Sequence, residues 1–423
     1  MGSLPDQAAR RAAGGLLAFG ASVVGRAIFV QPTIVVVALA GAYGPAVGAD
    51  EPPRLYEGQT LDDWRERIGR IDFAAPIRPE DVAGLRSIMA DRDAPWFSRR
   101  QAALTLARMG APAAAAIPDL IRLLDEPSDD PETSPRLWAL KALARFGPLS
   151  AEATPRIVEI IRDRSSPLAD RLTATEPLAQ IGGRHPAAVP ALIEVLEDSS
   201  PIAEEGDELE LRIAAAEGLS LTRAGLAVPA LTEACESSSL RLRRAAATAL
   251  ATFGAEAAPA LPVLAGLAAY DDAEEVREAA TESLGRMGYV AGPMLAALCG
   301  EEEAVVRRRA ATALGGMGRT AAPWLDAVRG RLADDDAEVR VAAIAAMWDI
   351  TGRMEGLEGP VLSLLGAEER SVRISASELL IRMGSAAEGL RPQLVELAET
   401  GSPEERTASR RVLLVWPEPT PGR

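Results

Sequence analysis

The amino-acid sequence predicts an all-α protein, a right-handed α-solenoid (superhelix) of about nine to ten helical hairpins. Three observations lead to this fold class. An arginine-containing motif returns at intervals of about 34 residues, its apolar residues keep the spacing of a helix, and a proline opens a second apolar segment in each interval. Because neither helix of such a unit can bury its apolar stripe alone, neighbouring units must stack into one continuous core.

The first helix of each unit is marked by the motif that reads VREAATESLGRMG at residues 276–288. After the arginine of each of the first nine units, an alanine lies at the third position, a leucine or methionine at the seventh and, except for Thr222, an apolar residue at the tenth. These offsets fall on one face of a helix, and the alanine predicts a close approach of neighbouring helices. A glycine then ends the helix in most units. The anchor arginines are Arg99, Arg136, Arg171, Arg212, Arg243, Arg277, Arg307, Arg340, Arg373 and Arg406.

The second helix of each unit is opened by a proline, which we expect at the first helical position, where a missing N–H costs nothing. Leucine or isoleucine follows two residues later in every unit. Each unit is therefore predicted to be a pair, helix A and then helix B. The prolines are Pro118, Pro155, Pro190, Pro229, Pro262, Pro293, Pro323, Pro360 and Pro392.

The first 49 residues differ in composition from the rest of the chain. Arg10 and Arg11 precede an apolar core, and the segment ends in Val47-Gly48-Ala49, which has the small residues of a cleavage site. Residues 1–49 therefore predict an export signal, or an N-terminal membrane anchor that spans the bilayer through residues 12–42 if it stays uncleaved. A misassigned start or a cytosolic segment is a further alternative.

The remaining chain divides into caps and repeats. We expect N-terminal capping helices in residues 50–97, with Thr60 as an N-cap, Asp63 as its acidic partner and Trp64 covering the core of the first repeat. The predicted ranges that follow are 98–403 for the repeat solenoid, 404–416 for a C-terminal capping helix and 417–423 for a disordered tail.

The repeat resembles the HEAT-repeat family, especially the short bacterial HEAT-like repeats of the phycobilin-lyase-associated type, in an exported bacterial form. The resemblance covers roughly residues 80–416 and extends to an acid shortly before the anchor arginine, as in Asp272 and Asp335. It implies a ladder of hydrogen bonds between neighbouring repeats, formed by acids and arginines. The arginines to which this role is carried over are Arg277, Arg307, Arg340 and Arg373.

The composition excludes several kinds of chemistry. The net charge of −16 opposes binding to nucleic-acid phosphates. The single histidine, His185, and the single lysine, Lys141, leave no catalytic triad, di-iron site or phosphate-binding loop. Cys235 and Cys299 lie two repeats apart at apolar positions, which predicts buried thiols without a disulfide. We therefore expect no catalytic residue, no metal site and no cofactor.

A binding surface is predicted on helix B, which lines the concave face of such solenoids. Its outward positions are acidic in the second to fourth repeats and become small or apolar in later ones. The acidic positions include Glu159, Glu194, Glu197, Glu233 and Glu236. An exposed apolar strip marks an interaction site, unless curvature or the C-terminal segment buries it. The candidate partner-binding residues are Tyr270, Met294, Trp324, Val361 and Leu364.

Acidic clusters and two longer loops lie between helix B and the next helix A. The clusters serve as helix N-caps or form an acidic rim for Ca²⁺ or a basic partner. The loops, Glu126–Pro135 and Ser199–Glu210, are binding insertions or neutral surface loops. The sequence leaves both pairs of alternatives open.

These observations predict an exported, monomeric, non-catalytic scaffold that binds a protein or peptide partner and no nucleic acid, in the periplasm or outside the cell. The first alternative is a lyase-associated HEAT-like enzyme subunit or chaperone that needs a partner or cofactor. The second is a structural envelope protein anchored in the membrane by its N-terminal segment.

Overall fold

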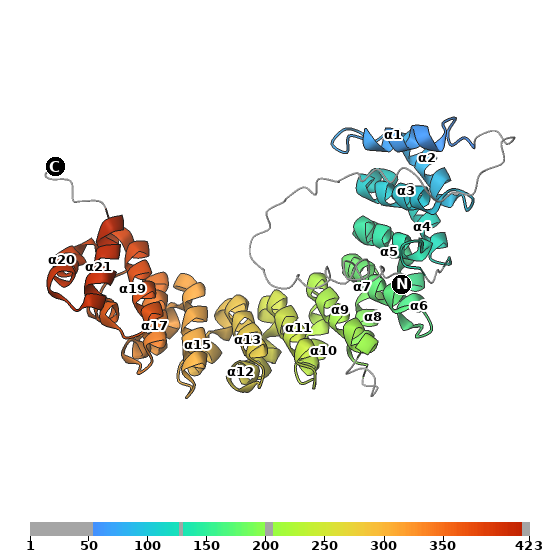
Figure 1. The fold of residues 1–423 in the computed structure, drawn as a ribbon. Helices are drawn as coiled ribbons and strands as arrows, with labels where there is room; N and C mark the ends of the chain where they lie inside the picture. Colours follow the sequence, from blue (N-terminus) through green and yellow to red (C-terminus); the bar gives the residue numbers. More distant parts are fainter. Residues whose placement is uncertain (1–53, 127–129, 199–205, 417–423) are drawn as a thin grey trace, which may run out of the picture. The chain divides into compact units, whose positions relative to one another are not determined.

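The computed structural model describes residues 54–126, 130–198 and 206–416, and these residues are helical with no β-strand among them. Helices A and B alternate along the chain, and the pairs follow one another in sequence order (Figure 1). Each helix A contacts the helix A of the next pair, so spatial neighbours are chain neighbours. The described part of the chain is therefore an all-α solenoid.

The helices of each class are as follows. The A helices are α3 (Trp96–Met109), α5 (Pro135–Phe146), α7 (Leu168–Ile181), α9 (Gly206–Thr222), α11 (Leu240–Leu250), α13 (Glu274–Met287), α15 (Ala304–Gly316), α17 (Ala337–Thr351) and α19 (Arg370–Met383). The B helices are α4 (Ile117–Leu123), α6 (Thr154–Arg162), α8 (Ala188–Leu196), α10 (Val228–Ala234), α12 (Leu261–Tyr270), α14 (Gly292–Leu298), α16 (Leu325–Arg329), α18 (Glu358–Ser363) and α20 (Arg391–Thr400). The terminal helices are α1 (Leu61–Gly69), α2 (Pro79–Ala90) and α21 (Pro403–Val415).

The alanine three residues after each of the first nine anchor arginines confirms its predicted role. All of these side chains are fully buried, as expected where one methyl group separates packed helices. Larger side chains at this position would force the helices apart. The buried alanines are Ala102, Ala139, Ala174, Ala215, Ala246, Ala280, Ala310, Ala343 and Ala376.

The helix A termini also follow the sequence prediction. Most A helices end at a glycine with positive φ, as α13 does at Gly288 with a φ of 69°. Nothing lies within 4 Å of a methyl group at Gly288, so it is the backbone conformation that favours glycine there. Arg223 occupies the same place after α9 and has a φ of 49°. A non-glycine residue in this region carries backbone strain.

The start of helix B differs from the prediction. The chain usually enters helix B through a 3₁₀ segment, such as η6 (Ala251–Ala260), which runs directly into α12. The proline is therefore the second helical residue in most B helices, for example Pro262 in α12, and not the first. The physical reason given for the proline still applies, because N–H groups of the first helical turn have no partner within the helix.

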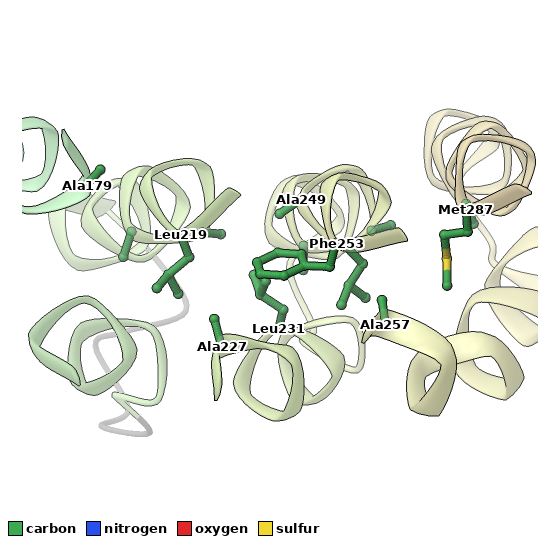
Figure 2. Packing of buried hydrophobic residues seen from close by; sticks show 14 of the residues in the cluster. Ala179, Leu219, Ala227, Leu231, Ala249, Phe253, Ala257 and Met287 are labelled. Carbon is green, nitrogen blue, oxygen red and sulfur yellow. The ribbon is translucent and has the colours of Figure 1, made fainter. Parts of the chain in front are cut away.

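The core lies between the row of A helices and the row of B helices. Figure 2 shows Leu219 of α9 and Met287 of α13 directed toward the B row, and Leu231 of α10 directed toward the A row. One hydrophobic cluster of buried residues extends from Tyr56 to Trp416. Its apolar burial supplies the stacking force between units.

The N-terminal cap contains the predicted capping box. The Thr60 hydroxyl accepts from the Asp63 N–H, and the Asp63 carboxylate accepts from the Thr60 N–H at 2.9 Å. Trp64 is buried against Gly84 of α2, where a methyl group would lie 1.9 Å from the indole ring. The indole N–H donates to the Tyr56 carbonyl at 2.8 Å. Trp64 therefore closes this end of the core.

The two predicted terminal segments, 1–49 and 417–423, lie outside the described residues. Within the described part, one helical run, Leu240–Tyr270, is long and apolar enough by composition to cross a membrane. It comprises α11, η6 and α12 and breaks at Gly254, so it forms one A–B pair of the array.

Candidate functional site

The outward sides of the B helices form what we call the helix-B face. On α6 and α8 this face carries carboxylates that are paired with arginines. Glu159 accepts from Arg156 at 2.6 Å, and Glu194 accepts from Arg162 at 2.5 and 3.0 Å. These pairs are exposed, so each contributes little to stability and leaves the surface polar.

Farther along the chain, an aromatic pair lies in the 3₁₀ segments that lead into the B helices. Tyr289 lies in η7 (Gly288–Ala291) and Trp324 in η8 (Gly318–Trp324), and their ring centroids are 4.9 Å apart with an angle of 57° between the planes. The Trp324 ring covers Gly292, where a methyl group would lie 2.3 Å from it. Tyr289 is 63% exposed and Trp324 is half-buried. The pair is therefore a fixed aromatic patch that solvent reaches.

Tyr270 is the other exposed aromatic residue of this region, at 76% exposed. Its hydroxyl donates to the Glu301 carboxylate at 3.0 Å, and this hydrogen bond and the charge of Glu301 raise the pKa of the phenol. Tyr270 ends α12, whereas Trp324 lies before α16. The two residues are thus at opposite ends of the B helices and do not form one cluster.

Between these ends the B helices present small residues, as predicted. Ala297 and Gly300 are exposed beside α14, and Met294 is half-buried against the core. We call Tyr270, Tyr289, Met294 and Trp324 the aromatic surface. Tyr289 was not among the sequence candidates, because it precedes Pro293, whereas the predicted outward positions follow the proline.

Val361 and Leu364 do not belong to this surface, which corrects the prediction. Both side chains are in the core, 0% and 1% exposed. In α18 the buried residues follow Pro360 at the first, fourth and fifth positions, whereas in α12 and α14 they include the second and sixth, so the buried face of α18 is shifted by one residue relative to its proline. Val361, Leu364 and Leu365 form an i, i+3, i+4 apolar stripe, and burial of that stripe sets the orientation of the helix.

A groove lies between α10 and η6, on the acidic half of the helix-B face. It has a volume of about 480 Å³, and its walls carry the exposed carboxylates of Glu233, Glu236 and Glu256. Pro229 and Pro259 supply apolar rings to its lining. The sequence singled out Glu233 and Glu236, but Glu256 precedes helix B and was missed.

The anchor arginines share a contact that the sequence did not predict. Every anchor arginine donates to a backbone carbonyl at the end of the preceding helix B or in the turn after it. Arg136 Nε donates to Leu124 O at 2.8 Å, and Arg307 Nη1 donates to Glu301 O at 2.9 Å. The other eight make equivalent bonds. These bonds satisfy carbonyls that a helix end leaves without a partner.

The ladder of acids and arginines is only partly as expected. Arg307 reaches the Asp334 carboxylate of the next turn with bonds of 2.9 and 2.7 Å, as predicted. Arg277, Arg340 and Arg373 instead donate to carbonyls of their own turns. The acid that pairs with Arg307 lies six residues before the next anchor arginine.

The residue six positions before the next anchor arginine explains why Arg307 pairs with an acid there and the other three arginines do not. It is Glu301 for Arg277, where the carboxylate bonds to Tyr270, and Ala367 and Thr400 for Arg340 and Arg373. The acids named from the sequence, Asp272 and Asp335, lie one residue too late. The signal that would have found the pairs is an aspartate six residues before an arginine, present at Asp271 and Asp334.

Arg243 forms a second clamp that the sequence candidates omitted. It binds Asp271 with bonds of 2.8 and 2.9 Å. Burial of Asp271 opposes its ionisation, but the Arg243 and Ala273 hydrogen bonds outweigh this and lower its pKa. The Arg307 bonds likewise hold the pKa of Asp334 below its ordinary value. Both aspartates therefore favour the charged, paired form.

Each of the two longer loops supplies a glutamate that pairs with an anchor arginine. Arg99 pairs with Glu126 at 3.0 Å, and Arg171 pairs with Glu208. Residues 127–129 and 199–205 of these loops lie outside the described residues. Glu126 and Glu208 thus have a structural role that the two sequence interpretations did not include.

The remaining candidates for chemistry are isolated. Cys235 and Cys299 are buried and unbonded, as predicted, and burial raises the pKa of each thiol to about 12. His185 Nδ1 accepts from the Ala187 N–H at 3.2 Å in a turn. The described ranges contain no group of three or more His, Cys, Asp or Glu side chains arranged to hold a metal ion.

Paired helices stacked in chain order, with buried alanines between them and capping arginines at the turns, define a solenoid of helical repeats. Residues 200–285 match the family model described as HEAT repeats. Residues 98–126 and 170–198 match the model described as PBS lyase HEAT-like repeat. The chain therefore contains HEAT repeats in these segments. A comparison with curated proteins gives no match.

Solved structures share this architecture at low sequence identity. Kap95p, solved with RanGDP, is 11% identical with a TM-score of 0.54 over 84% of this chain and 55% of its own. Importin beta is 15% identical with a TM-score of 0.50 over 84% and 53%. The CpcE–CpcF complex of phycocyanin lyase from Nostoc sp. PCC7120 is 20% identical with a TM-score of 0.33 over 63% and 94%. The chain spans about half the length of the first two, and the similarity to them shows the fold.

Proposed function

We propose that the protein is a non-catalytic scaffold that binds a protein partner on the aromatic surface of its helix-B face. The observation that carries this proposal is the Tyr289–Trp324 pair. Its ring centroids are 4.9 Å apart, the Trp324 ring lies against Gly292, and solvent reaches both rings. Aromatic residues of this kind are common anchors of protein interfaces. Kap95p, which shares the fold, was solved with a bound protein.

The mechanism of binding would be preorganised contact. Trp324 is confined between Tyr289 and the Gly292 backbone, and Tyr270 is oriented by Glu301. Side chains that are already ordered lose little conformational entropy on association, so more of the contact energy becomes affinity. The small residues between the two ends allow a partner backbone to approach the B helices closely.

We further propose that the protein acts as an exported monomer, in the periplasm or outside the cell, with residues 1–49 as its export signal. The basic start and apolar core of that segment support the proposal. Sequencing the N-terminus of the mature protein in each cell fraction tests it, and a full-length chain in the cytosol would contradict it.

A second candidate function is that of a lyase-associated subunit, favoured by the match of residues 98–126 and 170–198 to PBS lyase HEAT-like repeats. Such a subunit would need a partner or a cofactor for turnover. Stoichiometric binding of a protein without turnover distinguishes the scaffold from it.

The experiment that tests the scaffold is affinity capture with residues 50–423 from soluble and envelope extracts. The test variant is Met294→Glu/Trp324→Glu, and the control is Leu149→Glu/Leu414→Glu, which places the same charges on exposed leucines elsewhere. All three proteins must show the same helicity by circular dichroism. We expect wild type and control to capture one protein that the test variant loses. Equal capture by all three would overturn the aromatic surface as the binding site.

A further inference from the structure

The groove between α10 and η6 differs from the rest of the acidic helix-B face in its ion pairing. On α4 to α8, arginines neutralise most of the carboxylates: Asp119 pairs with Arg86, Glu159 with Arg156, and Glu194 with Arg162. In the described part of the chain, Glu233, Glu236 and Glu256 form no ion pair. Three negative charges therefore surround the groove without a cation of the same surface to offset them.

The lining of the groove also favours a ligand that has apolar surface. Its lining includes Pro229, Pro259 and Val228, which form an apolar floor beneath the carboxylates. Glu256 reaches back across the groove, since a methyl group at Gly225 would lie 2.6 Å from its carboxylate oxygen. The site is therefore a groove of about 480 Å³ with an apolar floor and anionic walls.

A side chain with an aliphatic stem and a cationic end matches both features. Arginine lays its methylene groups on apolar surface while its guanidinium remains at the polar rim. Its planar donors also pair with carboxylates in a bidentate manner. The net charge of −16 attracts a basic segment over a longer range.

The spacing of the carboxylates suggests how the cations are arranged in the partner. Glu233 lies in the last turn of α10 and Glu236 lies in the turn after it, where its N–H donates to the Glu233 carbonyl at 2.9 Å. This turn keeps the two residues one helical turn apart, about 5–6 Å. In an extended peptide, residues i and i+2 lie on the same side about 7 Å apart. Two arginines separated by one residue would therefore meet both glutamates.

We propose that this groove binds an extended basic peptide segment of the partner, with arginines at alternate positions. The proposal rests on the proposed scaffold function and deepens it by naming the chemistry of the bound segment. The aromatic surface and the groove lie on the same row of B elements, from α10 to η8. One partner would place its basic segment in the groove and an apolar segment on the aromatic surface.

The test is a titration of the full chain with fluorescein-labelled Gly-Ser-Arg-Leu-Arg-Ser-Gly, followed by fluorescence anisotropy. A peptide with both arginines replaced by glutamine is the ligand control. The test variant is Glu233→Gln/Glu236→Gln/Glu256→Gln. The matched variant is Glu388→Gln/Glu396→Gln/Glu399→Gln, which removes the same number of exposed charges at the last A–B pair.

We expect saturable binding of the arginine peptide by wild type and by the matched variant. Loss of three exposed ion pairs predicts about tenfold weaker binding by the test variant. Raising the salt concentration should weaken wild-type binding further. No saturable binding by wild type, equal weakening by both variants, or equal binding of the glutamine peptide would overturn the proposal. A variant that loses the peptide but still captures the partner would leave the scaffold function intact, so the two failures are distinguishable.

Discussion

Single arginines and aspartates determine how successive units are joined. Each anchor arginine caps a carbonyl near the end of the preceding helix B, and Arg243 and Arg307 also bind an aspartate of the following turn. Asp271 and Asp334 in turn accept main-chain N–H bonds at 2.9 and 3.1 Å. One side chain thereby links two helix ends, which is why its removal affects more than a single contact.

The Asp334 clamp predicts a pH-dependent loss of stability. Its folded pKa is below its unfolded value, so its contribution is fully present above the unfolded pKa and is lost as the pH falls through the folded pKa. We expect Asp334→Asn to lower the free energy of unfolding by about 2 kcal/mol at pH 7. Urea unfolding at several pH values measures this, with exposed Asp335→Asn as control. A difference from wild type that does not shrink as the pH falls below the unfolded pKa would contradict the explanation.

Arg223 predicts a stabilising substitution. Because its φ is 49° at a position that other units give to glycine, Arg223→Gly should relieve the strain of a left-handed non-glycine residue. The expected gain is about 0.5–1 kcal/mol, after the greater flexibility of glycine in the unfolded chain is subtracted. Thermal unfolding measures it. Gly254→Ala, the reverse change at φ 55°, should destabilise, and equal melting temperatures for both variants would contradict this account.

The buried cysteines predict chemical inertness. With thiol pKa values of about 12, raised by burial, Cys235 and Cys299 should not react with iodoacetamide at pH 8 in the folded protein. Both should react once urea unfolds the chain. Mass spectrometry of the alkylated protein measures the reaction, and rapid labelling of either thiol without denaturant would show that these units open locally.

At the scale of a helix, the sequence allowed the A helices to be placed closely, since their alanine, apolar and glycine positions recur at fixed offsets. The B helices were placed less well. Their phase was inferred from the proline, but a proline tolerates the second and third helical positions as well as the first. The buried stripe of α18 decided its orientation instead, and this is why Val361 and Leu364 were misassigned to the surface.

The fit of α1 on α2 predicts the effect of one methyl group. In Gly84→Ala the new Cβ would lie 1.9 Å from the Trp64 ring, so Trp64 must leave its place over the core. We expect a loss of about 1–3 kcal/mol, even though alanine favours the helix more than glycine does. Hydrogen exchange of residues 54–69 should accelerate. Gly69→Ala, which has nothing within 4 Å of its methyl group, is the control and should leave exchange unchanged.

Over the whole molecule, the repeat pattern was enough to predict an all-α solenoid, because each unit repeats the same burial requirement. The pattern could not identify which exposed residues meet in space. Tyr289 and Trp324 come from successive units and pair through the close approach at Gly292, a contact set by backbone geometry. Glu256 likewise comes from the unit after α10, and it lines the groove because its carboxylate lies against Gly225.

Contacts restricted to neighbours predict that the solenoid can be divided by a central mutation. Leu250 is fully buried in α11, and Leu250→Ala should cost about 3 kcal/mol by leaving a cavity. Since stability in such arrays is a sum of local and interface terms, urea unfolding of the variant should separate into two transitions. Exposed Leu240→Ala on the same helix is the control. A single shifted transition for Leu250→Ala would indicate cooperativity beyond neighbouring units.

The chain-order stacking of A helices also has a mechanical consequence. Tension applied between the first and last units would pass through every interface in turn, as through springs connected in series. The extensions of the interfaces would add, whereas the load at each would be the same. The molecule would therefore lengthen by small shifts shared among all units, and it would rupture first at the interface with the smallest yield force.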